Sequence, residues 1–191
     1  MIETFARTRA ELAADYLQLD AAYSDLFNGC SREQLVWRPG DDSWSIAECI
    51  EHVARGNSQY LPPIKEAIAK GGPAVPAGDY LFSPGGWFSR AFLKRIGPQI
   101  TVKFKAPAKI RPLSIDPEQA FQELRRGHAE IQELLAATAQ LDLKRIRFQN
   151  PFIPVLRLTV ATGFLIMAAH GRRHLQQAER VSKMDGFPRA K

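Results

Sequence analysis

Two histidines near the end of the chain, His170 and His174, have the spacing of a chelating pair. They occur in "AAHGRRHLQQ", directly after an apolar run. On a helix, side chains four residues apart project from one face, one turn from each other. Neutral imidazole is the commonest side-chain ligand of metal ions in proteins. The same spacing also arises on helices that bind no metal, so the pair alone leaves both interpretations open.

The remaining histidines of the chain are His52 and His128. His52 lies about two turns into a predicted helix and can meet the pair if that helix runs antiparallel to the last one. Three histidines with one open position form the geometry of a catalytic transition-metal site. The spacing thus favours a metal site made of His52, His170 and His174, while a lone histidine such as His52 is more often a core or interfacial residue. No catalytic or cofactor-binding residue is assigned. For His128, a hydrogen-bonded core histidine is the favoured interpretation, and an approach to the same cavity is the alternative.

Apolar residues recur at helical spacing over four long segments, at about residues 2–28, 45–70, 117–139 and 159–184. Two of the predicted starts carry clear signals. Ser45 and Glu48 have the spacing of a capping box, in which each side chain accepts a hydrogen bond from the other residue's amide. Asp116 is a good N-cap, and Pro117 suits the first position of the helix that follows.

Four amphipathic helices of this length predict an all-α fold, a four-helix bundle, in a single domain over residues 1–191. The connection from 73 to 115 is far longer than the few residues that join antiparallel neighbours. We therefore predict an up-down-down-up topology with this crossover between the second and third helices. Pro62 and Pro63 should kink or restart the second helix. "QITVKFKA" is predicted as extended chain and "QLDLKRIRFQNPFIPV" as a loop.

Composition limits the class of protein. The chain has 191 residues, of which 45% are hydrophobic and 24% charged, which is typical of a globular domain. No apolar run reaches the roughly 18 residues of a membrane helix, and the N-terminus lacks the apolar centre of a signal peptide. We expect a cytoplasmic protein with no membrane partner. The net charge is +6, but the basic residues are scattered and match no nucleic-acid-binding motif, so no nucleic-acid partner is expected. Cys30 and Cys49 form no CxxC motif.

Two longer stretches resemble the signature of the DinB/YfiT-like superfamily. They are "LVWRPGDDSWSIAECIEHV", with its Trp-Arg-Pro turn and Trp-Ser-Ile helix start, and "AAHGRRHLQQAERV", with its closing histidine pair. The resemblance implies an up-down-down-up four-helix bundle and a homodimer. It also implies a divalent metal ion, with zinc, nickel and iron as the candidates, held by His52, His170 and His174.

The resemblance further implies a thiol-dependent enzyme. Relatives of this type include S-transferases that use low-molecular-weight thiols such as bacillithiol, and mycothiol-dependent isomerases. The leading hypothesis is a metal-dependent S-transferase in which the metal holds a cofactor thiol as thiolate, which attacks a small-molecule substrate. One alternative is a hydrolase that uses a metal-bound water, with Glu48 or a neighbour as the base. The other is a metal-binding or dimerising bundle without catalytic activity.

Overall fold

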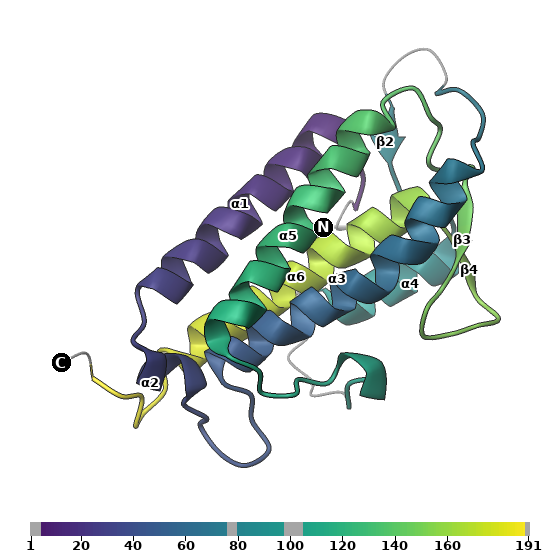
Figure 1. Ribbon diagram of the computed structural model, residues 1–191. Coiled ribbons are helices and arrows are strands. Elements are labelled where there is room, and N and C mark those ends of the chain that lie inside the picture. The colour runs from purple at the N-terminus through teal and green to yellow at the C-terminus, as the bar shows by residue number, and fades with distance from the viewer. Residues whose placement is uncertain (1–4, 76–79, 98–104, 190–191) are drawn as a thin grey trace.

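A computed structural model of the protein describes residues 5–75, 80–97 and 105–189. Within this part of the chain, four long helices form a bundle (Figure 1), which confirms the predicted fold class. The long helices are α1 (Arg9–Asn28), α3 (Ile46–Ala69), α5 (Pro117–Ala137) and α6 (Val160–Val181). The short elements are α2 (Arg32–Val36), α4 (Trp87–Ile96), the 3-10 helix η1 (Ala108–Ile110), and the strands β1 (Arg7–Thr8), β2 (Leu81–Phe82), β3 (Arg147–Gln149) and β4 (Arg157–Thr159).

Contacts between α1 and α6 show that these helices run parallel. The Tyr16 hydroxyl donates a hydrogen bond to the Phe164 carbonyl at 2.8 Å. Seven residues further along both helices, the Tyr23 hydroxyl donates to the Gly171 carbonyl at 2.7 Å. Both tyrosines are buried, so these bonds satisfy two hydroxyl groups in the bundle interior.

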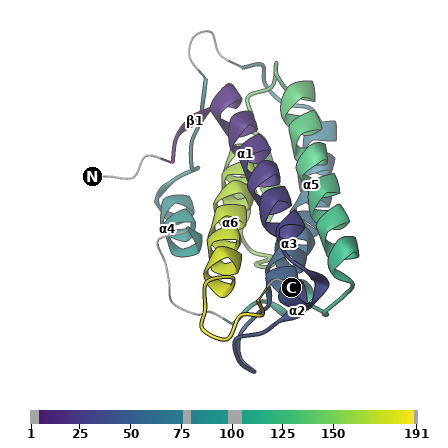
Figure 2. The ribbon, with the colours of Figure 1, turned by 90° about the vertical axis from the view of Figure 1, so that its left-hand side faces the viewer.

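The other helix pairs complete the predicted directions. Helix α3 runs parallel to α5, since its Lys65 pairs with Glu130, and its Asn57, eight residues earlier, packs on Gly127, which also comes before Glu130 on α5. Helix α3 runs antiparallel to α6, because Gly56 lies against His170, whereas Ile64, eight residues later on α3, lies against Gly163, seven residues earlier on α6. Helices α1 and α6 therefore run in one direction and α3 and α5 in the other, which is the up-down-down-up order (Figures 1 and 2).

Helix starts follow the capping signals with one correction. The capping box of Ser45 and Glu48 is present, and Asp116 caps α5. The first helix was expected from about residue 2, but α1 begins at Arg9. The Thr8 side chain caps it, and Arg7–Thr8 pairs as β1 with β2 in an antiparallel ladder. Residues 1–4 of that expectation lie outside the described residues.

The prolines of α3 do not restart the helix, which continues from Ile46 to Ala69. Pro62 removes the amide that would bond the Ser58 carbonyl. Both Pro62 and Ser58 are exposed, so water can bond that carbonyl instead. The helix ends before Gly71, whose φ of 75° is a left-handed conformation that suits glycine.

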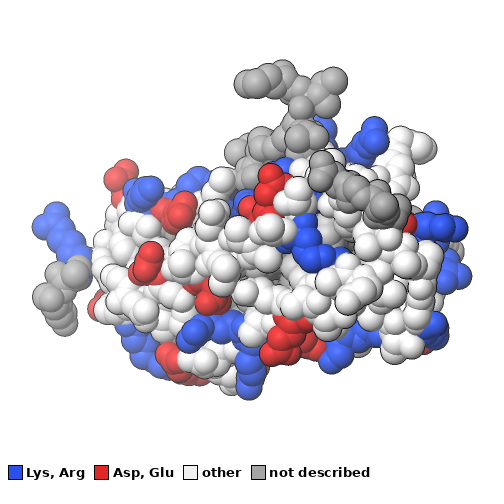
Figure 3. Space-filling model, turned by 90° about the horizontal axis from the view of Figure 1, so that it is seen from above, with Lys and Arg blue, Asp and Glu red and all other residues white. Residues whose placement is uncertain are grey.

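The connection from α3 to α5 contains β2, α4 and η1. Helix α4 packs against α6 on the outside of the bundle (Figure 2), and η1 packs against α3. Residues 98–104, which include most of the predicted extended stretch, lie outside the described residues. No helix in the described ranges is long and apolar enough to cross a membrane. Acidic and basic side chains are interspersed on the face shown in Figure 3.

The segment before α6 is a hairpin and not the predicted loop. Strands β3 and β4 pair antiparallel, with Arg147 opposite Thr159 and Gln149 opposite Arg157. Phe148 of β3 is 2% exposed and packs on the bundle core. The hairpin therefore covers the core beside the start of α6.

Candidate metal centre

Three histidines from two antiparallel helices converge on one point. His52 projects from α3, while His170 and His174 project from α6, one turn apart. Their candidate ligand nitrogens all lie within 4.8 Å of one another. The ring centroids are separated by 4.9 Å for His52 and His170, 4.5 Å for His52 and His174, and 4.6 Å for the α6 pair. The structure thus brings together the three residues that the sequence selected.

The spacing of the His52 and His170 ring nitrogens matches that of two ligands on one small cation. The Nε2 atoms of His52 and His170 lie 3.1 Å apart. Zinc–nitrogen bonds of about 2.0–2.1 Å in tetrahedral geometry place two ligand nitrogens roughly 3.3 Å apart. A tetrahedral ion with three imidazole ligands keeps one position open for a further ligand. The residues present therefore fit a divalent transition metal.

Hydrogen bonds on the outer ring nitrogens orient two of the three imidazoles. His52 Nδ1 lies 2.6 Å from the Ile110 carbonyl oxygen of η1, and His174 Nδ1 lies 3.0 Å from Gln177 Oε1. Both oxygens only accept hydrogen bonds, so each Nδ1 carries the proton and each Nε2 presents its lone pair. Such outer partners typically fix the tautomer of metal-ligating histidines.

Burial keeps the three imidazoles uncharged at neutral pH. It lowers the pKa of His52 to about 4, and the positive charges of Arg173 and Arg55 act in the same direction. Burial likewise lowers the pKa of His170 and of His174 well below the usual range, with mutual repulsion in the cluster as a further cause. Neutral imidazoles offer their lone pairs to a cation without competition from protons.

Two residues that sequence reasoning did not assign to the site shape the cluster. The Trp44 ring lies 4.6 Å from His52 and 5.7 Å from His174, and so covers the cluster on one side. In the sequence, Trp44 was noted only as part of the Trp-Ser-Ile helix start. Gly56 lies against the His170 ring. A lone glycine inside a helical pattern was the available signal for this close approach.

Glu48, the candidate base of a hydrolase, is occupied elsewhere. Arg38 Nε donates to one of its oxygens at 2.8 Å, and the Ser45 amide donates to the same oxygen at 2.9 Å. Ser114 Oγ donates to the other oxygen at 3.0 Å. These hydrogen bonds lower the pKa of Glu48 against the opposing effect of its burial. The carboxylate therefore stays ionised and ties the start of α3 to the connection before α5.

His128 does not join the cluster. It is 1% exposed on α5, and its Nδ1 lies 3.4 Å from Asp20 Oδ1 of α1. Its ring packs on Tyr16 and Tyr23 at centroid distances of 5.8 and 6.3 Å. This confirms the predicted core position of His128, but its Nδ1 makes no hydrogen bond to Asp20. The alternative, an approach to the metal cavity, is wrong, since His128 lies outside the histidine cluster.

Comparisons with known proteins place the chain in a family. Among solved structures, YfiT from Bacillus subtilis, described as a probable metal-dependent hydrolase with an unusual four-helix bundle topology, matches with a TM-score of 0.60. The identity is 15%, and the match covers 94% of this chain and 89% of that chain, which shows a shared fold. No curated protein matches the chain. A model of the DinB superfamily matches residues 15–178. The chain therefore belongs to the DinB superfamily.

Proposed function

We propose that the protein is a metal-dependent enzyme whose divalent cation is held by His52, His170 and His174. The convergence of three neutral imidazoles within 4.8 Å carries this proposal. The shared fold with YfiT, itself described as a probable metal-dependent hydrolase, supports it. Zinc, nickel and iron all accept imidazole ligands, so each is a candidate for the ion.

The chain supplies a site suited to the activation of a nucleophile. A divalent cation bound here would act as a Lewis acid and lower the pKa of a thiol or water at its open position. The three histidines are neutral and leave the charge of the ion uncompensated. Trp44 covers His52 and His174 and limits access of water from its side. The site would therefore stabilise an anionic nucleophile in surroundings that contain little water.

A thiol is the nucleophile that this arrangement favours. Hydrolysis generally uses a base to take a proton from water, but Glu48 and Glu51, the carboxylates nearest His52 on α3, are both held by other hydrogen bonds. A metal-held thiol loses its proton outright and needs no carboxylate base. In the proposed S-transferase reaction, the thiol would release its proton to solvent, its sulfur would form a bond to an electrophilic carbon of a small molecule, and the leaving group would depart with the bonding electron pair.

A metal-dependent hydrolase is the second candidate, favoured by the likeness to YfiT. For this reaction, a cation held by the three histidines would lower the pKa of a water molecule, whose proton would pass to solvent. The two candidates share the metal centre and differ in the nucleophile. They can therefore be separated by adding or omitting a thiol.

The test compares turnover of metal-loaded protein over a panel of electrophiles, with and without low-molecular-weight thiols. We expect thiol-dependent turnover that disappears in His174→Ala. Turnover of esters or amides without thiol would favour the hydrolase. No turnover by fully loaded protein with either nucleophile would overturn the enzymatic proposal and leave a metal-binding bundle.

We also infer that the protein acts as a homodimer in the cytoplasm. The support for a dimer is an exposed apolar pair on α4, where Trp87 is 80% and Phe88 is 42% exposed. Sedimentation velocity of the wild type beside Trp87→Ser tests it. A monomeric wild type would contradict the inference.

A further inference from the structure

Glu51 is a buried carboxylate directly before the candidate ligand His52. It is 1% exposed, yet its hydrogen-bond partners among the described residues are two backbone amides. The Leu113 amide donates to Oε1 at 2.7 Å, and the Ile115 amide donates to Oε2 at 3.3 Å. Burial of an ionised carboxylate costs free energy unless hydrogen bonds offset it. Glu51 therefore fastens the 113–115 turn to α3.

The turn that Glu51 holds has a demanding backbone conformation. Ser114 has a φ of 57°, the one positive φ outside glycine in the described part of the chain. Such a conformation persists where surrounding contacts determine it. Here the amides on both sides of Ser114 bond Glu51, while Ser114 Oγ donates to Glu48 and accepts from Arg38 Nη2 at 3.1 Å. The turn thus has one shape, set by α3.

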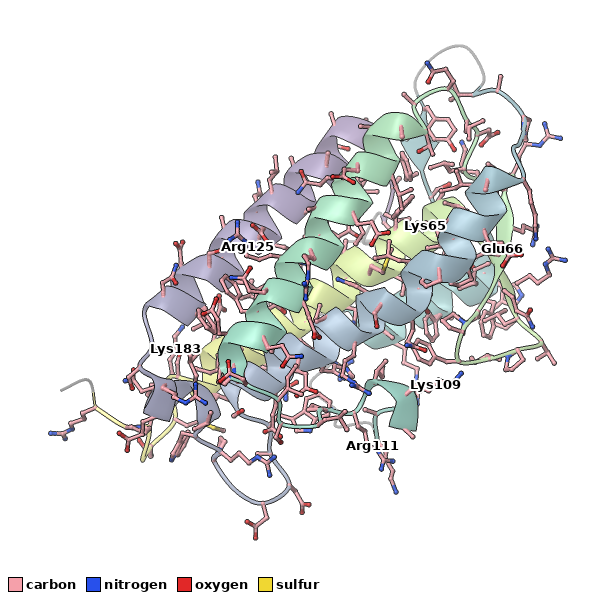
Figure 4. All side chains as sticks on the ribbon, in the orientation of Figure 1. Lys65, Glu66, Lys109, Arg111, Arg125 and Lys183 are labelled. Carbon is pink, nitrogen blue, oxygen red and sulfur yellow. The ribbon has the colours of Figure 1, made fainter. Side chains whose placement is uncertain are left out.

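The same segment of the connection reaches the metal centre a few residues earlier. The Ile110 carbonyl bonds His52 Nδ1, and the preceding Lys109 carbonyl accepts from Arg55 Nη2 at 3.0 Å. Figure 4 shows η1, with Lys109 labelled, beside α3. Apart from the single turn of η1, residues 105–116 have no regular secondary structure, and hydrogen bonds to α3 join this segment to the bundle.

The contacts on α3 form one face of the helix. Glu48, Glu51, His52 and Arg55 are spaced by three, one and three residues, so they lie within two turns of one another on one side. Each of them forms at least one hydrogen bond with the segment of residues 109–115. Among them only His52 is a candidate metal ligand, and the other three contact the connection.

We propose that Glu51 is a positioning residue of the metal centre, which holds the 113–115 turn and thereby keeps the Ile110 carbonyl on His52 Nδ1. This proposal rests on the metal site proposed above. With the carbonyl in place, the proton of His52 stays on Nδ1 and the lone pair of Nε2 faces the cluster. Without it, the proton can move to Nε2, the atom that would bind the cation.

Two variants separate the hydrogen bonds of Glu51 from its size. Glu51→Gln keeps the shape but has one acceptor oxygen and places an NH2 group against a backbone donor. Glu51→Leu removes both acceptors. Glu130→Gln is the matched control, because it makes the same chemical change at a partly exposed carboxylate on α5, which pairs with Lys65.

The first readout is the tautomer of His52 in the metal-free protein, measured by nitrogen-15 NMR of labelled histidine. We expect the Nδ1–H form in the wild type and in Glu130→Gln, and a mixture of both tautomers in Glu51→Gln and Glu51→Leu. Circular dichroism confirms that each variant is helical. An unchanged Nδ1–H form in both folded Glu51 variants would overturn the proposal.

The second readout is the affinity for Zn²⁺ or Co²⁺ in the same proteins. Loss of an outer hydrogen-bond partner typically costs about 10- to 100-fold in metal affinity, and we expect Glu51→Leu to fall in this range. Equal affinities in wild type and both variants would contradict the proposal. A wild type that binds no metal would instead refute the proposed function, while the tautomer measurement would still report on Glu51.

Discussion

A Cβ atom on Gly56 would lie 3.2 Å from Cε1 of His170, so the missing side chain at this position sets how closely the ring approaches α3. Gly56 follows His52 by one helical turn on the same helix. The glycine thus makes room for a ligand from α6 beside a ligand from α3. Glycine inside a helix costs stability relative to alanine, and here that cost has a structural reason.

Gly56→Ala should separate metal affinity from stability. Alanine raises helix propensity by up to about 1 kcal/mol, so the free energy of unfolding should stay level or rise. The added methyl group pushes the His170 ring by a few tenths of an ångström. We expect roughly tenfold weaker metal binding, as for other changes around ligating histidines. Chemical denaturation and metal titration measure the two effects.

Gly127→Ala provides the matched control for this change. Gly127 also lies inside a long helix, but its added Cβ would meet Asn57 at an ordinary 3.4 Å and touch no histidine of the cluster. We expect it to leave metal affinity unchanged. Equal losses of affinity in the two variants would contradict the role given to Gly56.

The metal-free protein should lose stability in mild acid. The pKa of His52 is lowered to about 4 in the folded state, against about 6.5 when unfolded. The unfolded chain therefore binds more protons between these values, and stability falls as pH drops from about 6.5 to about 4. For His52 alone the loss is of the order of 3 kcal/mol.

Urea denaturation across this pH window, with chelator present, measures the effect. His52→Gln removes this titration and should flatten the pH dependence relative to the wild type. An equally steep dependence in the variant would show that His52 is not the source. Since His170 and His174 are also buried with lowered pKa values, part of the slope should remain.

His128→Gln should affect stability but not the metal. The substitution removes the ring that packs on Tyr16 and Tyr23 and takes the imidazole away from Asp20 Oδ1, while Asp20 keeps its ion pair with Arg125 of α5. We expect a loss of about 1–3 kcal/mol in the free energy of unfolding, typical of an unpaired buried polar group. Metal content should match the wild type. Loss of metal with an intact fold would mean that His128 takes part in the site.

Local signals in the sequence explain why the helices and the histidine cluster were predictable. The capping box at Ser45, the proline after Asp116 and the spacing of His170 and His174 each act within a few residues. The length of the connection before α5 then indicated the helix directions. These directions were enough to bring His52 to the pair from α6.

The remaining features depend on contacts between distant segments. The bond between His52 and the Ile110 carbonyl spans 58 residues, and no local pattern marks a carbonyl as a partner. Strand β1 is two residues long and is defined by its pairing with β2. The helical spacing of apolar residues gave no sign of this pairing, so the first helix was predicted to begin too early. The hairpin of β3 and β4 was missed for the same reason, since its three-residue strands carry too short an alternation.

The most direct test of the metal centre is the metal content of untagged protein by elemental mass spectrometry, beside His52→Ala and His174→Ala. Circular dichroism of all three proteins serves as the folding control. We predict close to one divalent ion per chain in the wild type and a loss of that ion in both variants. A folded wild type without metal, even after incubation with zinc, nickel and iron, would contradict the metal centre and the function built on it.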